Sequence, residues 1–190
     1  MIKSLLETSA EVKKQTAIEC SQDAEAAARL IADSLAAGGK LMLCGNGGSA
    51  ADSQHLAAEF VATLDHTKPR PGLAALALTT DTSLLTAWSN DFGFQGVFAR
   101  QIEALGQADD VLLAISTSGN SKNIVEAVIT AQKMAVKTIA MTGAGGGQLA
   151  GLADIAITVP SQTVMHIQEA HIALGHAITA RAEQLLAEMG

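Results

Sequence analysis

Residues 41–60 read LMLCGNGGSAADSQHLAAEF, a short apolar run that passes through a glycine-rich turn into an alanine-rich stretch with helical spacing. The apolar run at 41–45 predicts a buried strand, and the helical spacing continues to Leu64. A strand that leads directly into a helix is the opening of a parallel βαβ unit. This stretch therefore predicts an α/β protein with a parallel sheet.

Four further apolar runs follow, and stretches with helical spacing separate them. Strands are expected at 73–79, 110–117, 136–143 and 154–160. Several of these runs are apolar on both faces, which is typical of strands in a parallel sheet that helices cover on both sides. We therefore predict a single domain over residues 1–190, with a five-stranded parallel sheet sandwiched by helices.

Helical segments are expected at both ends of the chain. Residues 2–37 should form N-terminal helices with a break near Ser21, where Ser21 or Asp23 could cap the second helix. Residues 81–104 should be mostly helical, with a break at Ser89–Asp91. Further helices are expected at 122–134, at 145–153 and, as one long C-terminal helix, at about 164–188.

Composition and charge narrow the classes of function. Hydrophobic residues make up 48% of the chain and charged residues 16%, so a disordered protein is excluded. The net charge of −7 argues against nucleic acid as a partner, and it means that any bound phosphate must be held by local neutral donors. Cys20 and Cys44 form no CxxC motif or disulfide framework, and no apolar stretch is long enough to span a membrane. We expect a cytoplasmic protein without a membrane partner.

Two loops carry the chemistry of anion binding. Residues 45–49 (GNGGS) follow the first strand and residues 116–121 (STSGNS) follow the third, so both should lie at the carboxyl edge of the sheet. Glycines let the backbone approach an anion, and the amides at a helix start favour negative charge. Either loop alone could be an ordinary turn with a serine cap. The first also fits a loose dinucleotide pattern, but the acidic residue expected about 20 positions later is missing.

Two pairs of polar residues have the spacing to share a helix face. His55 and Glu59 are four apart, and Gln168 and His176 are eight apart, which is about 80° around a helix. Histidine, glutamate and glutamine could together offer nitrogen and oxygen ligands to a divalent cation. On spacing alone, a His-x-x-x-Glu pair is more often a solvated helical pair, so the residues by themselves leave both interpretations open.

The chain resembles the SIS-domain phosphoheptose isomerases. The resemblance is carried by CGNGGSAADSQHLAAEF (44–60), SNDFGF (89–94), DDVLLAISTSGNS (109–121), the glycine-rich 141–147 and IQEAH (167–171), and it runs from about residue 24 to 185. It implies a flavodoxin-like SIS domain and conversion of D-sedoheptulose 7-phosphate to D-glycero-D-manno-heptose 7-phosphate. That product enters ADP-heptose synthesis for the lipopolysaccharide core. The resemblance also implies a homotetramer with sites at subunit boundaries, and we expect the helical segment 1–38 to serve in oligomerisation.

The same resemblance implies the site residues. It implies one Zn²⁺ per subunit, held by His55, Glu59, Gln168 and His176. The expected substrate contacts are Asn46, Gly47, Gly48, Ser49, Glu59, Asn90, Asp91, Ser116, Thr117, Ser118, Ser121 and Gln168.

Ketose–aldose isomerisation proceeds through an enediol. It needs a base that moves a proton between C1 and C2 and an acid that protonates the oxygens. We assign Glu59 as the base and His176 as the acid. A carboxylate bound to zinc is a poorer base, so whether Glu59 ligates, abstracts or does both stays open.

The chain departs from the family pattern at residues 164–166. Family members carry an arginine just before IQE, whereas Val164, Met165 and His166 stand here. Met165 cannot transfer a proton, which puts an acid/base role at that position in doubt.

Three other functions compete with the isomerase hypothesis. One is a non-catalytic SIS protein that binds the replication initiator protein, but such proteins tend to lose the carboxylate that Glu59 supplies here. The second is a sugar-phosphate-sensing regulator, although the chain has no helix-turn-helix segment. The third is an isomerase of a different sugar phosphate.

Overall fold

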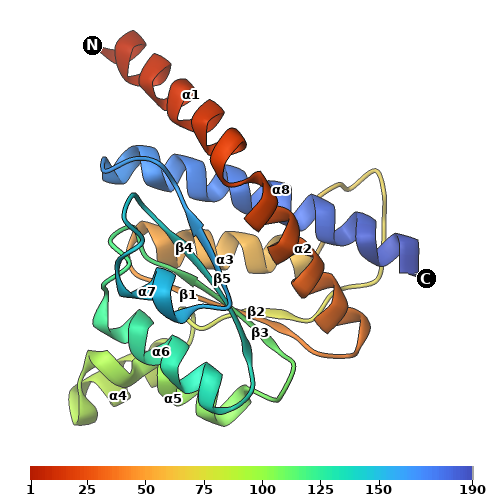
Figure 1. The fold of residues 1–190 in the computed structure, drawn as a ribbon. Coiled ribbons are helices and arrows are strands. Elements are labelled where there is room, and N and C mark those ends of the chain that lie inside the picture. The colour runs from red at the N-terminus through yellow and green to blue at the C-terminus, as the bar shows by residue number, and fades with distance from the viewer. Residues whose placement is uncertain (190) are drawn as a thin grey trace.

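The computed structural model describes residues 1–189. Within that range five strands form one parallel sheet in the order β2-β1-β3-β4-β5 (Figure 1). Their bounds are β1 Leu41–Gly45, β2 Ala75–Ala77, β3 Val111–Ile115, β4 Lys137–Thr142 and β5 Ile155–Thr158. The predicted α/β class and the five-stranded parallel sheet are confirmed. The order reverses between β1 and β3, which is where a doubly wound sheet opens a crevice for ligands.

Helices cover both faces of this sheet (Figure 1). One layer consists of α2 (Ser21–Ala36), α3 (Gly48–Val61) and the long α8 (Val164–Met189). The opposite layer consists of α4 (Thr82–Phe92), the short 3₁₀ helix η1 (Phe94–Gly96), α5 (Val97–Leu105), α6 (Lys122–Lys133) and α7 (Gly147–Leu152). The sheet is therefore the middle of three layers.

Alternation along the strands divides the core in two. In β1, Leu43 faces the layer of α2, α3 and α8, and Met42 faces the opposite layer. Leu113 and Leu112 do the same in β3, and all four side chains are buried. Because both faces of each central strand are covered, the strands are apolar throughout, as the sequence pattern indicates.

Two local predictions are wrong. The break in the segment after β2 lies at Gly93, not at Ser89–Asp91, because Gly93 takes a φ of 91° and its N–H donates to the carbonyl of Ser89 to close α4. The second N-terminal helix is not capped by Ser21 or Asp23. Its N-cap is Cys20, which makes no side-chain cap hydrogen bond, and the chain passes into α2 almost without interruption.

The first helix, α1 (Ile2–Glu19), projects from the body and meets it mainly at its carboxyl end (Figure 1). Several of its large apolar side chains are exposed: Ile2, Leu5, Leu6 and Ile18. None of the described helices is both long enough and apolar enough to cross a lipid bilayer.

Candidate active site

The first glycine-rich loop forms a tight turn between β1 and α3. Gly47 has a φ of 55°, and the amides of Ser49 and Ala50 donate to the carbonyls of Asn46 and Gly47. A Cβ on Gly45 would lie 2.4 Å from the carbonyl oxygen of Ser49, so the turn requires glycine there. Gly47 and Gly48 are exposed, whereas Ser49 is buried. The loop therefore offers its glycine backbone to a ligand, and the Ser49 hydroxyl lies inside the protein.

The second loop gathers hydroxyl groups. The Oγ of Ser116 lies 3.0 Å from that of Ser121 and 3.5 Å from that of Ser118. The amide of Asn120 donates to the Oγ of Ser118 at 3.2 Å. Three hydroxyls at the start of α6 thus lie together, as anion binding by neutral donors requires.

The two loops are tied together by a pair of amides that the sequence analysis missed. The Nδ2 of Asn46 donates to the Oδ1 of Asn123, and the Nδ2 of Asn123 donates back to Asn46, both at 2.9 Å. Asn123 is buried. Its only sequence signal is its place two residues after the STSGNS loop, because the pairing joins positions 77 residues apart.

A third glycine loop supports the second. Gly145, Gly146 and Gly147 all have positive φ, and a Cβ on Gly119 would lie 2.0 Å from the carbonyl oxygen of Gly146. The amide of Gln148 also donates to the Oδ1 of Asn120 at 3.0 Å. The sequence predicts only a glycine-rich helix here. In the structure this segment packs against the STSGNS loop and supports it.

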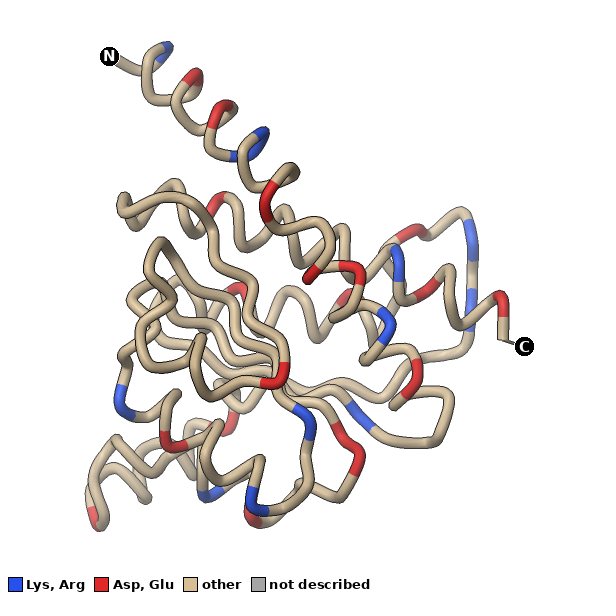
Figure 2. The backbone as a smooth tube through the Cα atoms, in the orientation of Figure 1, with Lys and Arg blue, Asp and Glu red and all other residues tan. Residues whose placement is uncertain are grey.

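These loops carry almost no charge. Figure 2 shows that Lys, Arg, Asp and Glu lie mainly on the helices and at the far ends of the strands. No lysine or arginine lies within 45–49, 116–121 or 143–147. The expected reliance on amides and hydroxyls agrees with this arrangement.

Three of the four predicted metal-ligating residues converge between α3 and α8. The Nε2 atoms of His55 and His176 are 2.8 Å apart, and the Nε2 of His55 lies 3.4 Å from the Oε1 of Glu59. One ligand atom from each residue lies within 4.8 Å of the others. His55 is about half exposed and Glu59 is 22% exposed, so the group opens to solvent.

A glycine brings the two helices close enough for this contact. A Cβ on Gly175 would lie 2.6 Å from both methyl carbons of Leu56, so only glycine lets α8 approach α3 at that level. Leu56 and Gly175 are the immediate neighbours of His55 and His176 in the chain. No spacing pattern within either helix predicts this approach, and Gly175 is the residue in the sequence that allows it.

Gln168 lies beside the first loop. Its Nε2 lies 2.4 Å from the position of a Cβ on Gly48, at the start of α3. Along α8 it precedes His176 by eight residues, about 12 Å of helix rise. Its amide therefore stands over the turn that binds substrate in the sequence hypothesis, between the phosphate loops and the three converging residues.

The donor set suits a divalent cation. Two imidazoles and a carboxylate are common zinc ligands. Two nitrogens at about 2.0–2.1 Å from one tetrahedral zinc ion would be about 3.3 Å apart, slightly more than the distance between the Nε2 atoms of His55 and His176. A small rotation of either ring gives that spacing, and a fourth position is then left for glutamine, water or substrate.

A carboxyl group lies behind the histidines. Among the described residues, the buried Oδ2 of Asp52 has no hydrogen-bond partner. Burial raises the pKa of Asp52, and the charges of His55 and His176 oppose that rise. Asp52 is thus a partly buried carboxyl group close enough to the histidine pair to interact with its charge.

Other residues that the sequence singles out lie outside this group. Asn90 and Asp91 are exposed near the end of α4, and the Nδ2 of Asn90 donates to the Oδ1 of Asp91 at 2.7 Å. His66 is exposed in the loop before β2. His171 is fully buried with its Nε2 3.0 Å from the carbonyl of Thr142, and burial lowers its pKa to about 4.

The segment that departs from the family pattern contributes a histidine to another contact. Met165 is exposed, and His166 is buried with its Nδ1 3.2 Å from the Oε2 of Glu169. A hydrogen bond from Ser9 and the one to His166 lower the pKa of Glu169. Residues 166 and 169 thus join the start of α8 to α1.

The sequence is similar to a domain family and to proteins of one enzyme class. The SIS-domain family matches residues 5–143. A phosphoheptose isomerase of Akkermansia muciniphila is 52% identical over 162 residues, which is 85% of each chain. A phosphoheptose isomerase of Thiobacillus denitrificans is 49% identical and covers 95% of this chain and 92% of its own.

Solved structures agree. The phosphoheptose isomerase GmhA of Neisseria gonorrhoeae matches with a TM-score of 0.90 and 42% identity, over 96% of this chain and 97% of that one. The NanR protein of Vibrio vulnificus, in complex with ManNAc-6P, shares the fold alone, at 17% identity and a TM-score of 0.64 over 97% of this chain and 62% of its own.

Proposed function

This chain belongs to the SIS-domain family of phosphoheptose isomerases, and from that premise we propose how its residues convert D-sedoheptulose 7-phosphate to D-glycero-D-manno-heptose 7-phosphate. It is an isomerase, and its substrate is a small sugar phosphate. One observation carries the assignment of the site. Glu59 and His176, distant in sequence, come together beside His55 at the open seam between α3 and α8.

In the proposal the phosphate binds at the carboxyl edge of the sheet. The hydroxyls of Ser116, Ser118 and Ser121 and the backbone at Thr117 hold its oxygens, and the amides at the start of α6 favour its charge. The Asn46–Asn123 pair keeps the first loop beside this cradle, the group of three serine hydroxyls that holds the phosphate. The sugar then extends along Gly47, Gly48 and Gln168 towards the histidines. Asn90 and Asp91, with their polar side chains exposed near the end of α4, remain proposed contacts for the sugar hydroxyls.

Glu59 and His176 divide the proton transfers. The carboxylate of Glu59 takes the proton from C1 of the ketose and returns it to C2, so the carbon-bound proton moves without net loss. His176 donates a proton to O2 as the C2 carbonyl becomes a hydroxyl, and it recovers one from O1 as the aldehyde forms. In the absence of zinc, the contact between the two Nε2 atoms orients His176, because only one ring of the pair can donate in it. If these Nε2 atoms hold zinc, the proton that His176 transfers would be the one on its Nδ1.

His55, Glu59 and His176 would hold a zinc ion, with the Gln168 amide as a fourth ligand after its side chain turns from Gly48. A bound zinc ion would polarise the substrate oxygens and stabilise negative charge on them. Purified protein should contain close to one zinc per chain, and His55→Ala should lose it. An active enzyme free of metal would contradict this part of the proposal.

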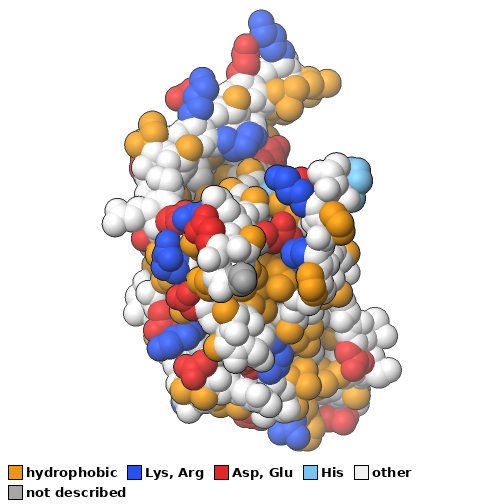
Figure 3. All heavy atoms as spheres, turned by 90° about the vertical axis from the view of Figure 1, so that its right-hand side faces the viewer, with side chains coloured by type: hydrophobic (Ala, Val, Ile, Leu, Met, Phe, Trp, Pro, Cys, Tyr) orange, Lys and Arg blue, Asp and Glu red, His pale blue; other side chains and the backbone are white. Residues whose placement is uncertain are grey.

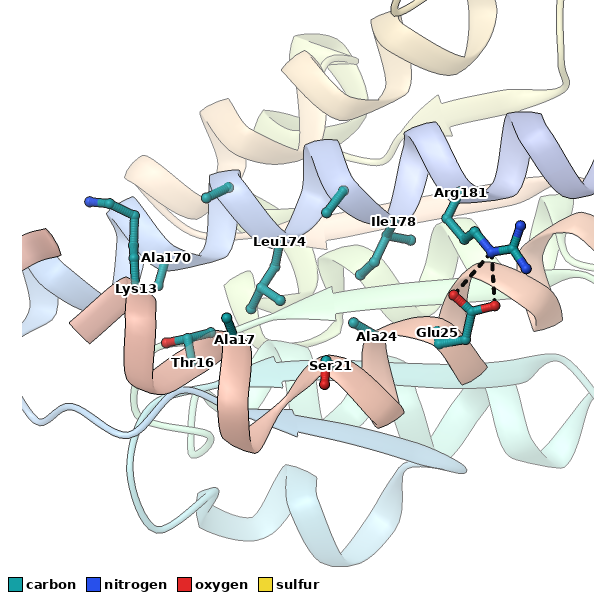
Figure 4. A pocket seen from close by; sticks show the side chains of 12 residues that line it. Lys13, Thr16, Ala17, Ser21, Ala24, Glu25, Ala170, Leu174, Ile178 and Arg181 are labelled. Atoms are coloured by element: carbon teal, nitrogen blue, oxygen red, sulfur yellow. Dashed lines mark hydrogen bonds and ion pairs between the residues drawn. The ribbon is translucent and has the colours of Figure 1, made fainter. Parts of the chain in front are cut away.

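The N-terminal segment 1–38 is proposed to join subunits into a homotetramer. α1 stands clear of the body with hydrophobic side chains on its surface (Figure 3). Beside it, α1, α2 and α8 line a mainly apolar hollow of about 320 Å³, in which Leu174 and Ile178 face Ala17 and Ala24 (Figure 4). Helices of a second copy would cover these surfaces. Light scattering on a variant with Leu5 and Leu6 changed to serine should show smaller particles than the parent.

The metabolic place of the reaction follows from the substrate. We propose that the enzyme acts in the cytoplasm at the first step of ADP-heptose synthesis for the lipopolysaccharide core. The alternative of a non-catalytic SIS protein is not favoured, because the carboxylate of Glu59 lies with two histidines in an arrangement that catalysis uses.

A direct assay tests the proposed function. The purified protein is incubated with sedoheptulose 7-phosphate, and the aldose is followed by its reaction with a carbonyl reagent. Turnover is expected in the parent and not in Glu59→Gln. Absence of turnover in the parent, or the same rate in both proteins, would contradict the proposal.

A further inference from the structure

We infer that Arg70 and Glu183 are positioning residues that hold the end of α3 against α8 and so keep Glu59 and His176 in register. The inference rests on the proposed roles of Glu59 and His176. Arg70 belongs to the loop between α3 and β2, and Glu183 lies on α8, seven residues after His176. Neither residue belongs to the candidate active site described above.

Arg70 closes the carboxyl end of α3. Its Nη2 donates to the carbonyl of Glu59 and its Nη1 to the carbonyl of Phe60, both at 2.9 Å. α3 ends at Val61, so these are carbonyls of its last turn, which no later turn of the helix can satisfy. A cation at this position also favours the helix dipole. The amide of Leu73 also donates to the carbonyl of Phe60, at 3.1 Å, so loss of Arg70 would mainly leave the carbonyl of Glu59 without its donor.

The same guanidinium joins α3 to α8. Its Nε donates to the Oε1 of Glu183 at 2.8 Å, and its Nη2 contacts the same oxygen. The amide of Leu64 donates to that oxygen as well, at 3.4 Å. Both charged side chains are only 17% exposed, so the pair is largely screened from water and its geometry is held by several partners at once.

The Arg70–Glu183 ion pair, which we name the clamp, lies where it can fix the positions of Glu59 and His176 relative to each other. Seven residues are about two helical turns, so Glu183 and His176 lie on the same side of α8. On α3 the clamp binds the backbone of Glu59 itself. Gly175 sets the distance between α3 and α8 near His55 and His176. The Arg70–Glu183 clamp fixes how the two helices are aligned along their length, next to Glu59. Proton transfer depends on that register to within about an ångström.

The loop holds Arg70 in place for this task. Pro69 and Pro71 flank it and restrict the backbone on both sides. Its Nη1 also donates to the carbonyl of Pro71 at 3.0 Å. Lysine cannot reproduce this set of bonds, because one ammonium group cannot reach two helix carbonyls and a carboxylate in the fixed fork of a guanidinium.

The test compares steady-state kinetics on sedoheptulose 7-phosphate for Arg70→Lys, Arg70→Ala, Glu183→Gln and the parent. We expect kcat to fall about tenfold in Arg70→Lys and about 100-fold in Arg70→Ala, with KM within about twofold of the parent. Glu183→Gln keeps an oxygen acceptor and should lose less than Arg70→Ala. If Arg70→Ala does not fold, the two conservative variants decide the question.

A matched control separates positioning from general stability. The ion pair of Lys40 with Asp110 is also mostly buried, but it lies at the amino end of β1, on the opposite edge of the sheet from the phosphate loops. Lys40→Ala should lower the melting temperature and leave kcat unchanged.

The inference is overturned if folded Arg70→Lys and Glu183→Gln keep kcat within twofold of the parent, or if Lys40→Ala loses as much kcat as they do. Glu59→Gln, measured alongside, keeps the two hypotheses apart. If it retains the parental kcat, the proposed function itself fails.

Discussion

The phosphate loops and the seam between α3 and α8 are built in opposite ways. The loops present backbone amides and hydroxyls whose places are set by glycines and short-range hydrogen bonds. In the seam, His55 and Glu59 are neighbours on α3, and the packing of α8 at Gly175 brings His176 to them. In the proposed mechanism, substrate capture and proton transfer therefore have separate structural supports. Changes in the loops should therefore raise KM, and changes at the seam should lower kcat.

The largest expected effect is at the seam. Glu59→Gln keeps the size of the side chain but removes the base, so kcat should fall by about 10³-fold, within the range of general base catalysis. KM should change little, because the loops are intact. A coupled assay at saturating substrate measures this, with circular dichroism as the check on folding. A large rise in KM with little change in kcat would show that Glu59 binds substrate. It would contradict the separation between loops that bind substrate and a seam that transfers protons.

The second effect tests the packing that makes the seam. Gly175→Ala puts a methyl group 2.6 Å from the methyl carbons of Leu56, so either the buried Leu56 side chain must shift or α8 must move away from α3. We expect kcat to fall by about 100-fold and the free energy of unfolding to drop by about 1–3 kcal/mol. Gly151→Ala on α7 is the control, because a Cβ there meets no heavy atom within 4 Å. Equal kcat values in the two variants would contradict the role of Gly175.

The third effect concerns a contact between the two regions. His171 on α8 donates from Nε2 to the carbonyl of Thr142 at the end of β4, and burial lowers its pKa to about 4. Its unfolded pKa is about 6.5, so the unfolded state binds more protons between these values. Stability should therefore fall as the pH falls from about 6.5 to about 4, by about 3 kcal/mol in total.

Denaturant titrations across that pH range check this prediction. His171→Gln, which cannot be protonated, should show a flatter dependence of the unfolding free energy on pH. If the slope is unchanged in the variant, His171 is not its source.

The smallest effect is in the loops. Ser118→Ala removes one hydroxyl from the cradle of Ser116 and Ser121, so KM should rise about tenfold while kcat stays within about twofold. The inhibition constant of inorganic phosphate, measured as a competitive inhibitor, should rise in parallel with KM. A variant with normal KM and reduced kcat would show that the loop does not bind phosphate.

Much of the fold could be predicted from the sequence because its signals are local. The runs at 41–45 and 111–115 are apolar on both faces, and Gly45 marks the end of the first. The break after α4 was misplaced because Gly93, rather than the polar residues before it, takes the positive φ that ends the helix. The cap of α2 was missed because the chain enters that helix without any side-chain cap.

The candidate site was predictable only in part, for the same reason. The STSGNS loop is contiguous, so its hydroxyls could be grouped from the sequence. The convergence of His55 with His176 depends on a glycine that packs against Leu56, and no spacing rule within either helix reveals it. Asn123 and Arg70 were missed because their partners lie far away in the chain.

One measurement tests the division between loops and seam most directly: a crystal structure of Glu59→Gln with sedoheptulose 7-phosphate bound. We expect the phosphate to lie among the hydroxyls of Ser116, Ser118 and Ser121. C1 and C2 should lie within about 3.5 Å of the side chain at position 59 and O2 within hydrogen-bond reach of His176. A sugar phosphate whose phosphate group lies at the histidines, or whose C1 and C2 lie far from residue 59, would contradict the account.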